Sequence, residues 1–341
     1  MADSFELKIG KGLRDLSDET LAFFRQLGVE HVVMPSRFNL KPAKRPLVPG
    51  ASFGPDDDQP FEPWSAEELK RIRGRLAEHG LDAVTVHLPV MWRVLHGKPD
   101  AGQEIENAKQ SIRAAGEAGL SVVEYNFTPL RGSEGYSWTL GPGRIGLRNY
   151  DHARTKDLPP LPNVGTHSRE QMWERLEGFL RAVVPVAEQA GVRLALHPND
   201  PPIPVFRGAA QPVRTLDDLK RLIEVVDSPS NGITLDTGVT TEMGEDAAAA
   251  IRYFGERDRI NHVHFRNVRV ETPYYKYLET AHDAGDADLL ACMRAFRDVR
   301  YRYLIIPDHT PALDGDTVGS QVGWAFALGY LQSLRHAAAK G

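Results

Sequence analysis

The sequence Arg193-Leu-Ala-Leu-His197 is a short apolar run that ends in a potential metal ligand, and three later runs repeat this pattern. They are Gly232-Ile-Thr-Leu-Asp236, Ile260-Asn-His262-Val-His264 and Tyr303-Leu-Ile-Ile-Pro-Asp308. β-Branched or aromatic residues and nearby turn formers make these runs typical of buried parallel strands. Parallel α/β proteins gather their chemistry at the carboxyl ends of strands. A single polar residue there is commonly a cap, but four in succession predict a divalent-metal site formed by His197, Asp236, His264 and Asp308.

The same alternation of strand and helix patterns runs through the whole chain. Apolar runs at 5–9, 31–35, 82–87 and 120–127 bring the number of expected strands to eight, and each is followed by a helical pattern. We therefore expect residues 1–341 to form a single (β/α)8 barrel of the α/β class, with long loops at 36–63 and 128–166 on its C-terminal face. The alternative is an open doubly wound sheet. No glycine-rich phosphate-binding sequence supports it, because Gly10-Lys-Gly12 is only a fragment that we expect to form a turn.

Composition narrows the class of protein. The chain has 341 residues, of which 41% are hydrophobic, so it can bury a large core. Its net charge of -5 and the lack of a basic stripe argue against a nucleic-acid partner. We see no signal peptide and no apolar run long enough to span a bilayer, and we expect a cytoplasmic protein without a membrane partner. The single cysteine, Cys292, excludes a disulfide within the chain.

The expected loop at 128–166 is rich in aromatic and basic residues, including Arg131, Tyr136, Trp138 and Arg148. Long loops in compact domains are usually functional, and this one would rise from the same end of the barrel as the predicted metal ligands. We interpret it as a lid over an anionic substrate, with an oligomer-forming excursion as the alternative.

Several motifs taken together resemble those of the mannonate dehydratases, within the xylose isomerase-like TIM barrels. The resemblance extends in order from the expected third strand to the C-terminal part of the chain. The similar stretches are Tyr125-Asn-Phe-Thr-Pro129, His197-Pro-Asn-Asp-Pro-Pro202, Asn231-Gly-Ile-Thr-Leu-Asp-Thr-Gly238, His264-Phe-Arg-Asn267, Glu279-Thr-Ala-His-Asp-Ala-Gly-Asp286 and Pro307-Asp-His309. The family's ligands are a His, a Cys, a His and an Asp on the last four strands. The resemblance implies that His197, Asp236, His264 and Asp308 take these roles, the same four residues that the strand ends predict.

The chain departs from the family at five places near the predicted site. Asp236 replaces the ligand Cys, Ile306 replaces an Arg, Thr310 replaces a Gly, His87 replaces an acidic residue, and the region before Trp324 lacks the family's tyrosine. A carboxylate is a harder ligand than a thiolate, so two histidines and two aspartates favour one Mn²⁺ ion, with Mg²⁺, Co²⁺ or Zn²⁺ possible. The resemblance also suggests a homo-oligomer, a dimer or a tetramer.

The primary functional hypothesis is dehydration of a sugar acid such as D-mannonate to 2-keto-3-deoxygluconate and water. This reaction requires a metal ion to stabilise the enolate, a base and an acid. The candidate catalytic residues are His309, Asp308, His262 and Tyr125, and the candidate substrate-binding residues are Arg266, Asn267, His87 and Asn126. Arg266 could instead pair with a metal ligand.

Two other functions remain open. One is a metal-dependent sugar isomerase or epimerase, which needs a carboxylate base such as Glu124 or Asp200. Glu124 and Tyr125 alternate on their strand, so only one of them can face the barrel interior, and an inward Glu124 would favour the isomerase. The other is a binding barrel without catalytic activity.

Overall fold

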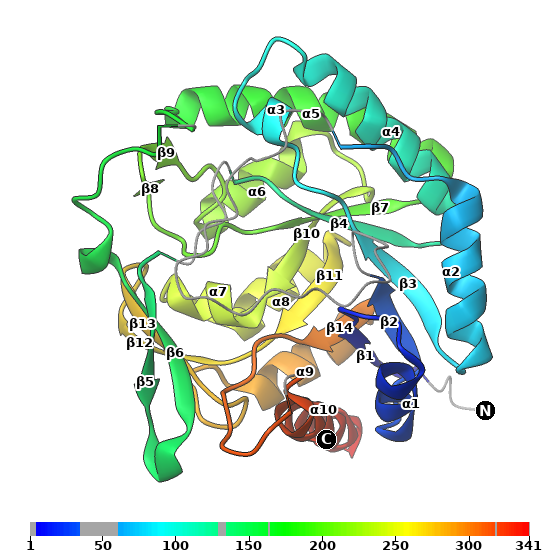
Figure 1. The fold of residues 1–341 in the computed structure, drawn as a ribbon, viewed down its shortest axis with the longest axis vertical. Coiled ribbons are helices and arrows are strands. Elements are labelled where there is room, and N and C mark those ends of the chain that lie inside the picture. The colour runs from blue at the N-terminus through cyan, green and yellow to red at the C-terminus, as the bar shows by residue number, and fades with distance from the viewer. Residues whose placement is uncertain (1–4, 35–60, 129–133, 163, 318, 341) are drawn as a thin grey trace.

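The computed structural model describes residues 5–34, 61–128, 134–162, 164–317 and 319–340. Eight parallel strands close into a barrel, in the order β1-β14-β11-β10-β7-β4-β3-β2 (Figure 1). They are β1 (Lys8–Gly12), β2 (His31–Met34), β3 (Asp82–His87), β4 (Val122–Asn126), β7 (Arg193–His197), β10 (Asn231–Asp236), β11 (Ile260–Phe265) and β14 (Leu304–Pro307). The prediction of a single (β/α)8 barrel is confirmed.

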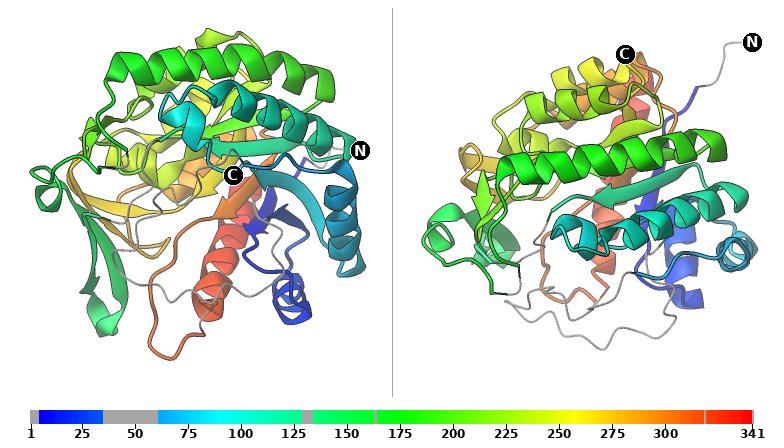
Figure 2. Two further views of the ribbon diagram at one scale, coloured as in Figure 1. Left: turned by 45° about the horizontal axis from the view of Figure 1, so that its top comes forward. Right: turned by 90° about the horizontal axis from the view of Figure 1, so that it is seen from above.

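Helices follow every barrel strand and cover the outside of the barrel (Figures 1 and 2). They are α1 (Asp18–Gln26), α2 (Ala66–Glu78), α3 (Trp92–Leu95), α4 (Ala101–Glu117), α5 (Arg169–Ala190), α6 (Leu216–Val225), α7 (Thr237–Glu242), α8 (Ala247–Gly255), α9 (Leu289–Asp298) and α10 (Gln321–Lys340). Local signals set several of their ends. The longest helix, α5, begins with a capping box between Ser168 and Gln171 and ends at Gly191, whose φ of 66° is left-handed. The single cysteine, Cys292, is buried in α9 and free.

Alternation along each strand separates the outer core from the barrel interior. In β10, Ile233 and Leu235 join the main hydrophobic core beneath the helices, while Thr234 and Asp236 belong to the other face of the strand. In β11, Val263 and Phe265 likewise face the helix layer. The polar side chains of these strands therefore point into the barrel, and the last ones lie at its C-terminal end.

Gly10 and Lys11 correct one prediction, because they lie within β1 and do not form a turn. A Cβ atom on Gly10 would lie 2.0 Å from the carbonyl oxygen of His31, so glycine here allows β1 and β2 to approach each other closely. Lys11 is buried, and its Nζ lies 3.7 Å from the centre of the Trp324 ring. Trp324 therefore takes part in packing α10 against β1.

The segment 128–166 is the second correction, because it is not one irregular loop. It contains β5 (Tyr136–Leu140) and β6 (Gly146–Asp151), which pair with each other and, through β6, with β13 (Lys276–Glu279). With β12 (Val268–Thr272) they form a four-stranded antiparallel sheet beside the barrel (Figure 2). The loop after β4 and the loop after β11 are thus paired across more than a hundred residues of sequence. We call the sheet formed by β12, β13, β6 and β5 the side sheet. A smaller hairpin, β8 (Val205–Phe206) and β9 (Ala209–Ala210), lies between β7 and α6.

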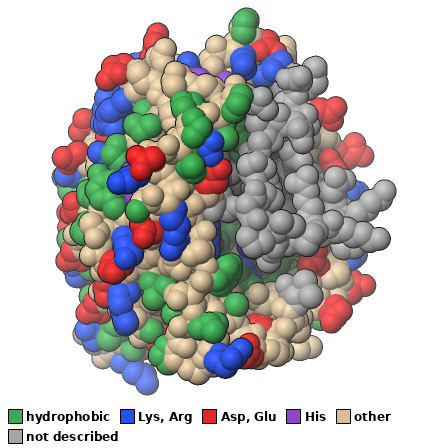
Figure 3. Space-filling view, turned by 60° about the vertical axis from the view of Figure 1, so that its left-hand side comes forward, with side chains coloured by type: hydrophobic (Ala, Val, Ile, Leu, Met, Phe, Trp, Pro, Cys, Tyr) green, Lys and Arg blue, Asp and Glu red, His purple; other side chains and the backbone are tan. Residues whose placement is uncertain are grey.

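The expected loop at 36–63 lies outside the described residues except for 61–63. Figure 3 shows basic and acidic side chains interspersed on one face, in keeping with the small net charge. Among the described residues, none of the helices is long and apolar enough to cross a bilayer.

Candidate metal centre

The four predicted metal ligands come together at the C-terminal end of the barrel. The Oδ2 atom of Asp236 lies 3.4 Å from Nε2 of His197 and 3.9 Å from Nδ1 of His264. The same Nδ1 lies 3.5 Å from Oδ2 of Asp308. Asp236, His264 and Asp308 are one group that could hold a metal ion, with ligand atoms within 4.8 Å of one another. A second such group, Glu124, His197 and His264, shares His264 with the first.

Both histidines have one ring nitrogen available for a cation. Nδ1 of His197 donates a hydrogen bond to the carbonyl oxygen of Pro198 at 2.7 Å, which leaves Nε2 unprotonated in the neutral ring. Nδ1 of His264 is buried and has no hydrogen-bond partner among the described residues, although two carboxylates surround it. A divalent cation between these atoms would satisfy all of them, so the donor set fits a metal ion.

The electrostatics keep the carboxylates of this site ionised. Burial alone would raise the pKa of Asp236, but Arg266, His197 and His264 hold it below its ordinary value. Burial likewise opposes ionisation of Asp308, while His309 and His264 lower its pKa well below the usual range. Ionised carboxylates are the form that coordinates a metal ion.

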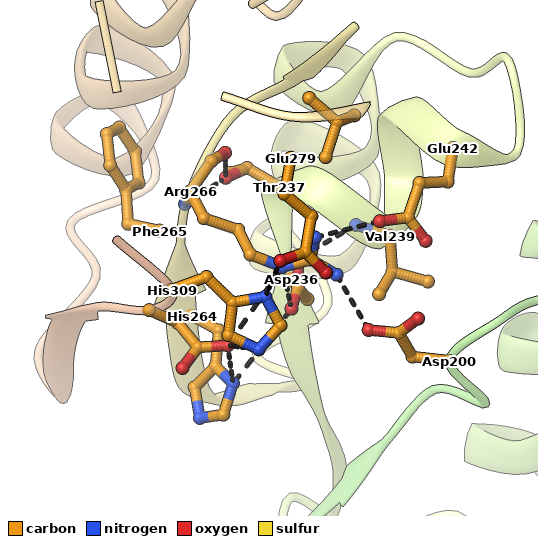
Figure 4. Close-up of polar contacts among 12 residues, drawn as sticks. Asp200, Asp236, Thr237, Val239, Glu242, His264, Phe265, Arg266, Glu279 and His309 are labelled. Atoms are coloured by element: carbon orange, nitrogen blue, oxygen red, sulfur yellow. Dashed lines mark hydrogen bonds and ion pairs between the residues drawn. The ribbon is translucent and has the colours of Figure 1, made fainter. Parts of the chain in front are cut away.

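Arg266 is the centre of a buried ion-pair network behind Asp236 (Figure 4). Its Nε donates to Oδ2 of Asp236 at 3.0 Å, and its two terminal nitrogens donate to Oε1 of Glu242 at 2.8 Å and to Oδ2 of Asp200 at 2.9 Å. All three nitrogens are thus engaged within the protein, and the side chain is 1% exposed. The structure therefore does not support substrate binding by Arg266. It fits the alternative in which Arg266 orients a metal ligand.

One guanidinium cannot neutralise three carboxylates. Glu242 is completely buried, and burial together with Asp200 and Asp236 raises its pKa well above the ordinary value, although Arg266 opposes the shift. A proton on Glu242 therefore relieves the excess negative charge of the network. Glu242 was not among the sequence candidates, since it lies on α7, a short helix that no sequence pattern predicted.

The side sheet supplies further partners to the same network. The hydroxyl of Tyr136 donates to Oδ1 of Asp200 at 2.6 Å, and the hydroxyl of Tyr277 lies 3.0 Å from the same oxygen. The two hydroxyls are 2.7 Å apart. Tyr136 lies on the edge strand β5 and Tyr277 on the interior strand β13, so two strands of the side sheet converge on one carboxylate.

His309 is held between the metal centre and the side sheet. Its Nδ1 lies 3.1 Å from Oε2 of Glu279 on β13, and its Nε2 lies 3.5 Å from Oδ2 of Asp308. The other oxygen of Glu279 accepts a hydrogen bond from Arg148 on β6 at 3.2 Å. Burial lowers the pKa of His309, but Asp308 and Glu279 outweigh this effect and raise it. Its ring is 30% exposed, so His309 can meet a substrate.

The orientation of β4 shows which of Glu124 and Tyr125 faces the barrel interior. Glu124 faces the barrel interior, where its Oε1 lies 3.1 Å from Nε2 of His264. Tyr125 faces the helices, and its ring centre lies 5.5 Å from that of Phe179 on α5. Because Tyr125 is on the far side of the strand from the ligands, the structure does not support its predicted catalytic role.

Four further candidates lie at different depths. His262 is completely buried one layer below His264, and its ring nitrogens have no hydrogen-bond partner among the described residues. Asn267 is buried and bonds to the backbone of Val268, His282 and Ala287. Neither placement supports contact with a substrate. By contrast, Nδ2 of Asn126 donates to Nε2 of His87 at 2.7 Å, and Asn126 is paired in register with the ligand candidate His197.

Comparison with solved structures defines the class of this barrel. A xylose isomerase-like TIM barrel protein from Mycobacterium smegmatis, solved in complex with magnesium, covers 97% of this chain and 97% of its own, with a TM-score of 0.59 and 14% identity. At that identity the match shows the fold alone. The chain has the xylose isomerase-like TIM barrel fold, as the motifs predict.

The particular family follows from closer matches. The family model for D-mannonate dehydratase matches residues 19–140 and 161–341. Mannonate dehydratase 2 from Halalkalibacterium halodurans is 30% identical over 285 residues, which are 74% of this chain and 81% of the relative. The crystal structure of mannonate dehydratase from Streptococcus suis serotype 2 has a TM-score of 0.83 and 26% identity, covering 98% of this chain and 94% of that one. The chain belongs to the D-mannonate dehydratase family. This confirms the prediction of a dehydratase-type enzyme.

Proposed function

We propose that this protein dehydrates a sugar acid of the D-mannonate type to a 2-keto-3-deoxy acid, with a divalent cation held by His197, Asp236, His264 and Asp308. The observation that carries the proposal is the convergence of these four side chains, with neighbouring ligand atoms 3.4 to 3.9 Å apart, in a member of this family. When bound, the cation supplies Lewis-acid stabilisation of the negative charge that develops at the substrate carboxylate.

The protein's own residues manage the protons. Dehydration breaks the C2–H bond, forms a C2=C3 double bond and expels the C3 hydroxyl, which leaves as water after taking a proton. The resulting enol becomes the 2-keto acid when its C2 hydroxyl loses a proton and C3 gains one. His309 is our candidate for one of the two proton transfers, because it is partly exposed and is oriented by Glu279. His87 and Asn126 are the candidates for holding substrate hydroxyls at the ends of β3 and β4.

The donor set favours a hard to borderline metal ion. Two carboxylates and two imidazoles suit Mn²⁺ best, with Mg²⁺, Co²⁺ and Zn²⁺ as alternatives. The homo-oligomer and the cytoplasmic location stay predictions.

A sugar isomerase or epimerase is the second candidate function. The inward orientation of Glu124 favours it, because that chemistry needs a carboxylate base inside the barrel. Ile306 adds to this argument, since it packs with Val33 and Leu304 where the family has an arginine, so this position offers no cation to a substrate carboxylate.

The experiment is to load the protein with Mn²⁺ and to assay a panel of aldonates for 2-keto acids and a panel of aldoses and ketoses for isomers. We expect keto-acid formation from D-mannonate or a close epimer. The His197→Ala variant should bind Mn²⁺ at least about 100-fold more weakly, since even residues that only support metal ligands cost 10- to 100-fold. Metal binding with isomer formation and no keto acid would favour the second function. If neither the wild-type protein nor the variant bound a metal ion, the proposal would fail.

A further inference from the structure

Glu124 lies in the barrel interior among the proposed metal ligands, but its contacts differ from theirs. It is 3% exposed, and its Oε1 lies 3.1 Å from Nε2 of His264. The same oxygen accepts a hydrogen bond from the hydroxyl of Thr234 on β10 at 3.2 Å. Thr234 lies two residues before Asp236, so it holds Glu124 from below the ligand layer.

The two nitrogens of His264 face different surroundings. Nε2 faces Glu124, whereas Nδ1 faces Asp308 and Asp236 at 3.5 and 3.9 Å. A neutral imidazole has one N–H donor and one acceptor nitrogen. With the proton on Nε2, the ring donates to Glu124 and turns its Nδ1 lone pair toward the two aspartates. The other tautomer would set the Nε2 lone pair against the Glu124 carboxylate and would block the ligand position with N–H.

We propose that Glu124 is a positioning residue that fixes the ring and tautomer of His264, with Nδ1 directed at the cation site, and that Thr234 holds Glu124 in place. The inference rests on the proposed metal centre. The two histidine ligands are then oriented in complementary ways: a backbone carbonyl fixes His197 through Nδ1, and a carboxylate fixes His264 through Nε2. Such supporting carboxylates set the orientation and basicity of metal-bound histidines.

The competing role for Glu124 is direct coordination, because Glu124, His197 and His264 also form a group that could hold a metal ion. The two roles differ in what a glutamine at this position would do. The amide oxygen of glutamine still accepts a hydrogen bond from Nε2, so it preserves positioning. It replaces an anionic ligand with a neutral one, so it weakens direct coordination.

The test compares metal binding by the wild-type protein and by Glu124→Ala, Glu124→Gln and Thr234→Val. Calorimetric titration with Mn²⁺ gives the affinity, and the visible absorption of the Co²⁺-loaded proteins reports the ligand geometry. We expect Glu124→Ala to weaken Mn²⁺ binding about 10- to 100-fold. Glu124→Gln should restore most of the affinity with a Co²⁺ spectrum like that of the wild-type protein. Thr234→Val should have a smaller effect than Glu124→Ala.

Each other outcome overturns a definite part of the argument. Weak binding and an altered Co²⁺ spectrum in Glu124→Gln would mean that Glu124 is a ligand. Wild-type affinity in Glu124→Ala would show that His264 needs no such support. If the wild-type protein bound no cation, the proposed metal centre would fail together with this inference. The isosteric Glu124→Gln variant keeps the test valid if Glu124→Ala does not fold.

Discussion

Two regions of the molecule contribute to the same site by different routes. One consists of the carboxyl ends of β7, β10, β11 and β14, and the other is the side sheet. The barrel strands present His197, Asp236, His264 and the adjoining Asp308 directly, as consecutive parallel strands do. The side sheet instead reaches the site from outside, through Tyr136 and Tyr277 on Asp200 and through Glu279 on His309. One region offers candidate ligands, and the other fixes the groups around them.

Arg266 and Asp200 join the two regions. Arg266 belongs to the segment just after β11 and contacts the ligand candidate Asp236. Asp200 accepts hydrogen bonds both from this guanidinium and from the two tyrosine hydroxyls. A shift of the side sheet would therefore reach Asp236 through three successive hydrogen bonds, from a tyrosine hydroxyl to Asp200, from Arg266 to Asp200 and from Arg266 to Asp236. The difference between the regions teaches that a barrel loop with its own pairing can act as a rigid support for a site as well as a cover over it.

Arg266→Met removes the residue that joins the two regions and should have the largest effect on stability. The substitution leaves the buried Asp236 and Glu242 and the partly buried Asp200 without their cation, so we expect the free energy of unfolding to fall by about 3–5 kcal/mol. Urea unfolding of the metal-free protein measures this loss. The matched control is Arg193→Met. Arg193 begins β7, at the end opposite His197, and its partner Asp258 is half exposed, so this substitution should cost about 1 kcal/mol. Equal losses in the two variants would contradict a special role for the Arg266 network.

The ligand candidates could be predicted from sequence because their signal is local. A short apolar run ending in a polar residue marks a strand end, and parallel strands in sequence order bring their ends together. This local signal was not enough to predict the orientation of Glu124. Alternation showed that either Glu124 or Tyr125 faces inward, but not which one. Placing Tyr125 against Phe179 leaves a buried hydroxyl without a partner among the described residues, which costs far less than burying an ionised carboxylate beneath the helices.

The groups around the ligands could not be predicted in the same way. The positions of Glu242, Tyr136 and Tyr277 depend on a short helix and on pairing between distant loops. One signal was available for the side sheet. The aromatic runs at 136–140 and 146–151 flank the turn formers Gly141-Pro-Gly143, which is typical of a β-hairpin. Its pairing with the hairpin after β11 has no local signal, because the two are brought together only when the barrel closes.

Tyr136→Phe tests whether the side sheet stabilises the network as well as lying beside it. The variant keeps the ring and removes the hydroxyl that donates to the Asp200 carboxylate, so we expect a loss of about 1.5–3 kcal/mol in the free energy of unfolding. The control is Tyr150→Phe in the same aromatic cluster, where the hydroxyl lies 3.4 Å from Thr155 and 3.5 Å from His152. Its loss should be smaller. A Tyr136→Phe variant as stable as Tyr150→Phe would mean that the side sheet merely covers Asp200.

The smallest expected effect is a pH dependence of stability that comes from His282. This histidine follows β13, and its Nε2 donates to the carbonyl oxygen of Phe265 in β11 at 2.9 Å, so it also joins the two regions. Burial lowers its pKa to about 4, well below the ordinary value for a histidine. The unfolded chain therefore takes up this proton as the pH falls below the ordinary histidine pKa, while the native protein stays unprotonated until about pH 4. The contribution of His282 to the free energy of unfolding is therefore fully present at pH 7.5 and is smaller by about 1 kcal/mol at pH 5.5.

His282→Gln retains a side-chain amide that can donate to the Phe265 carbonyl and removes the titration. Between pH 7.5 and 5.5 the metal-free wild-type protein should lose about 1 kcal/mol more stability than this variant, as measured by urea unfolding at each pH. His336→Gln, at an exposed position on α10, provides the control and should follow the wild-type protein. If His282→Gln lost as much stability as the wild-type protein, the histidine would have to accept a proton in the native state. The contact between β11 and the segment after β13 would then be open to water and would not be part of a rigid support.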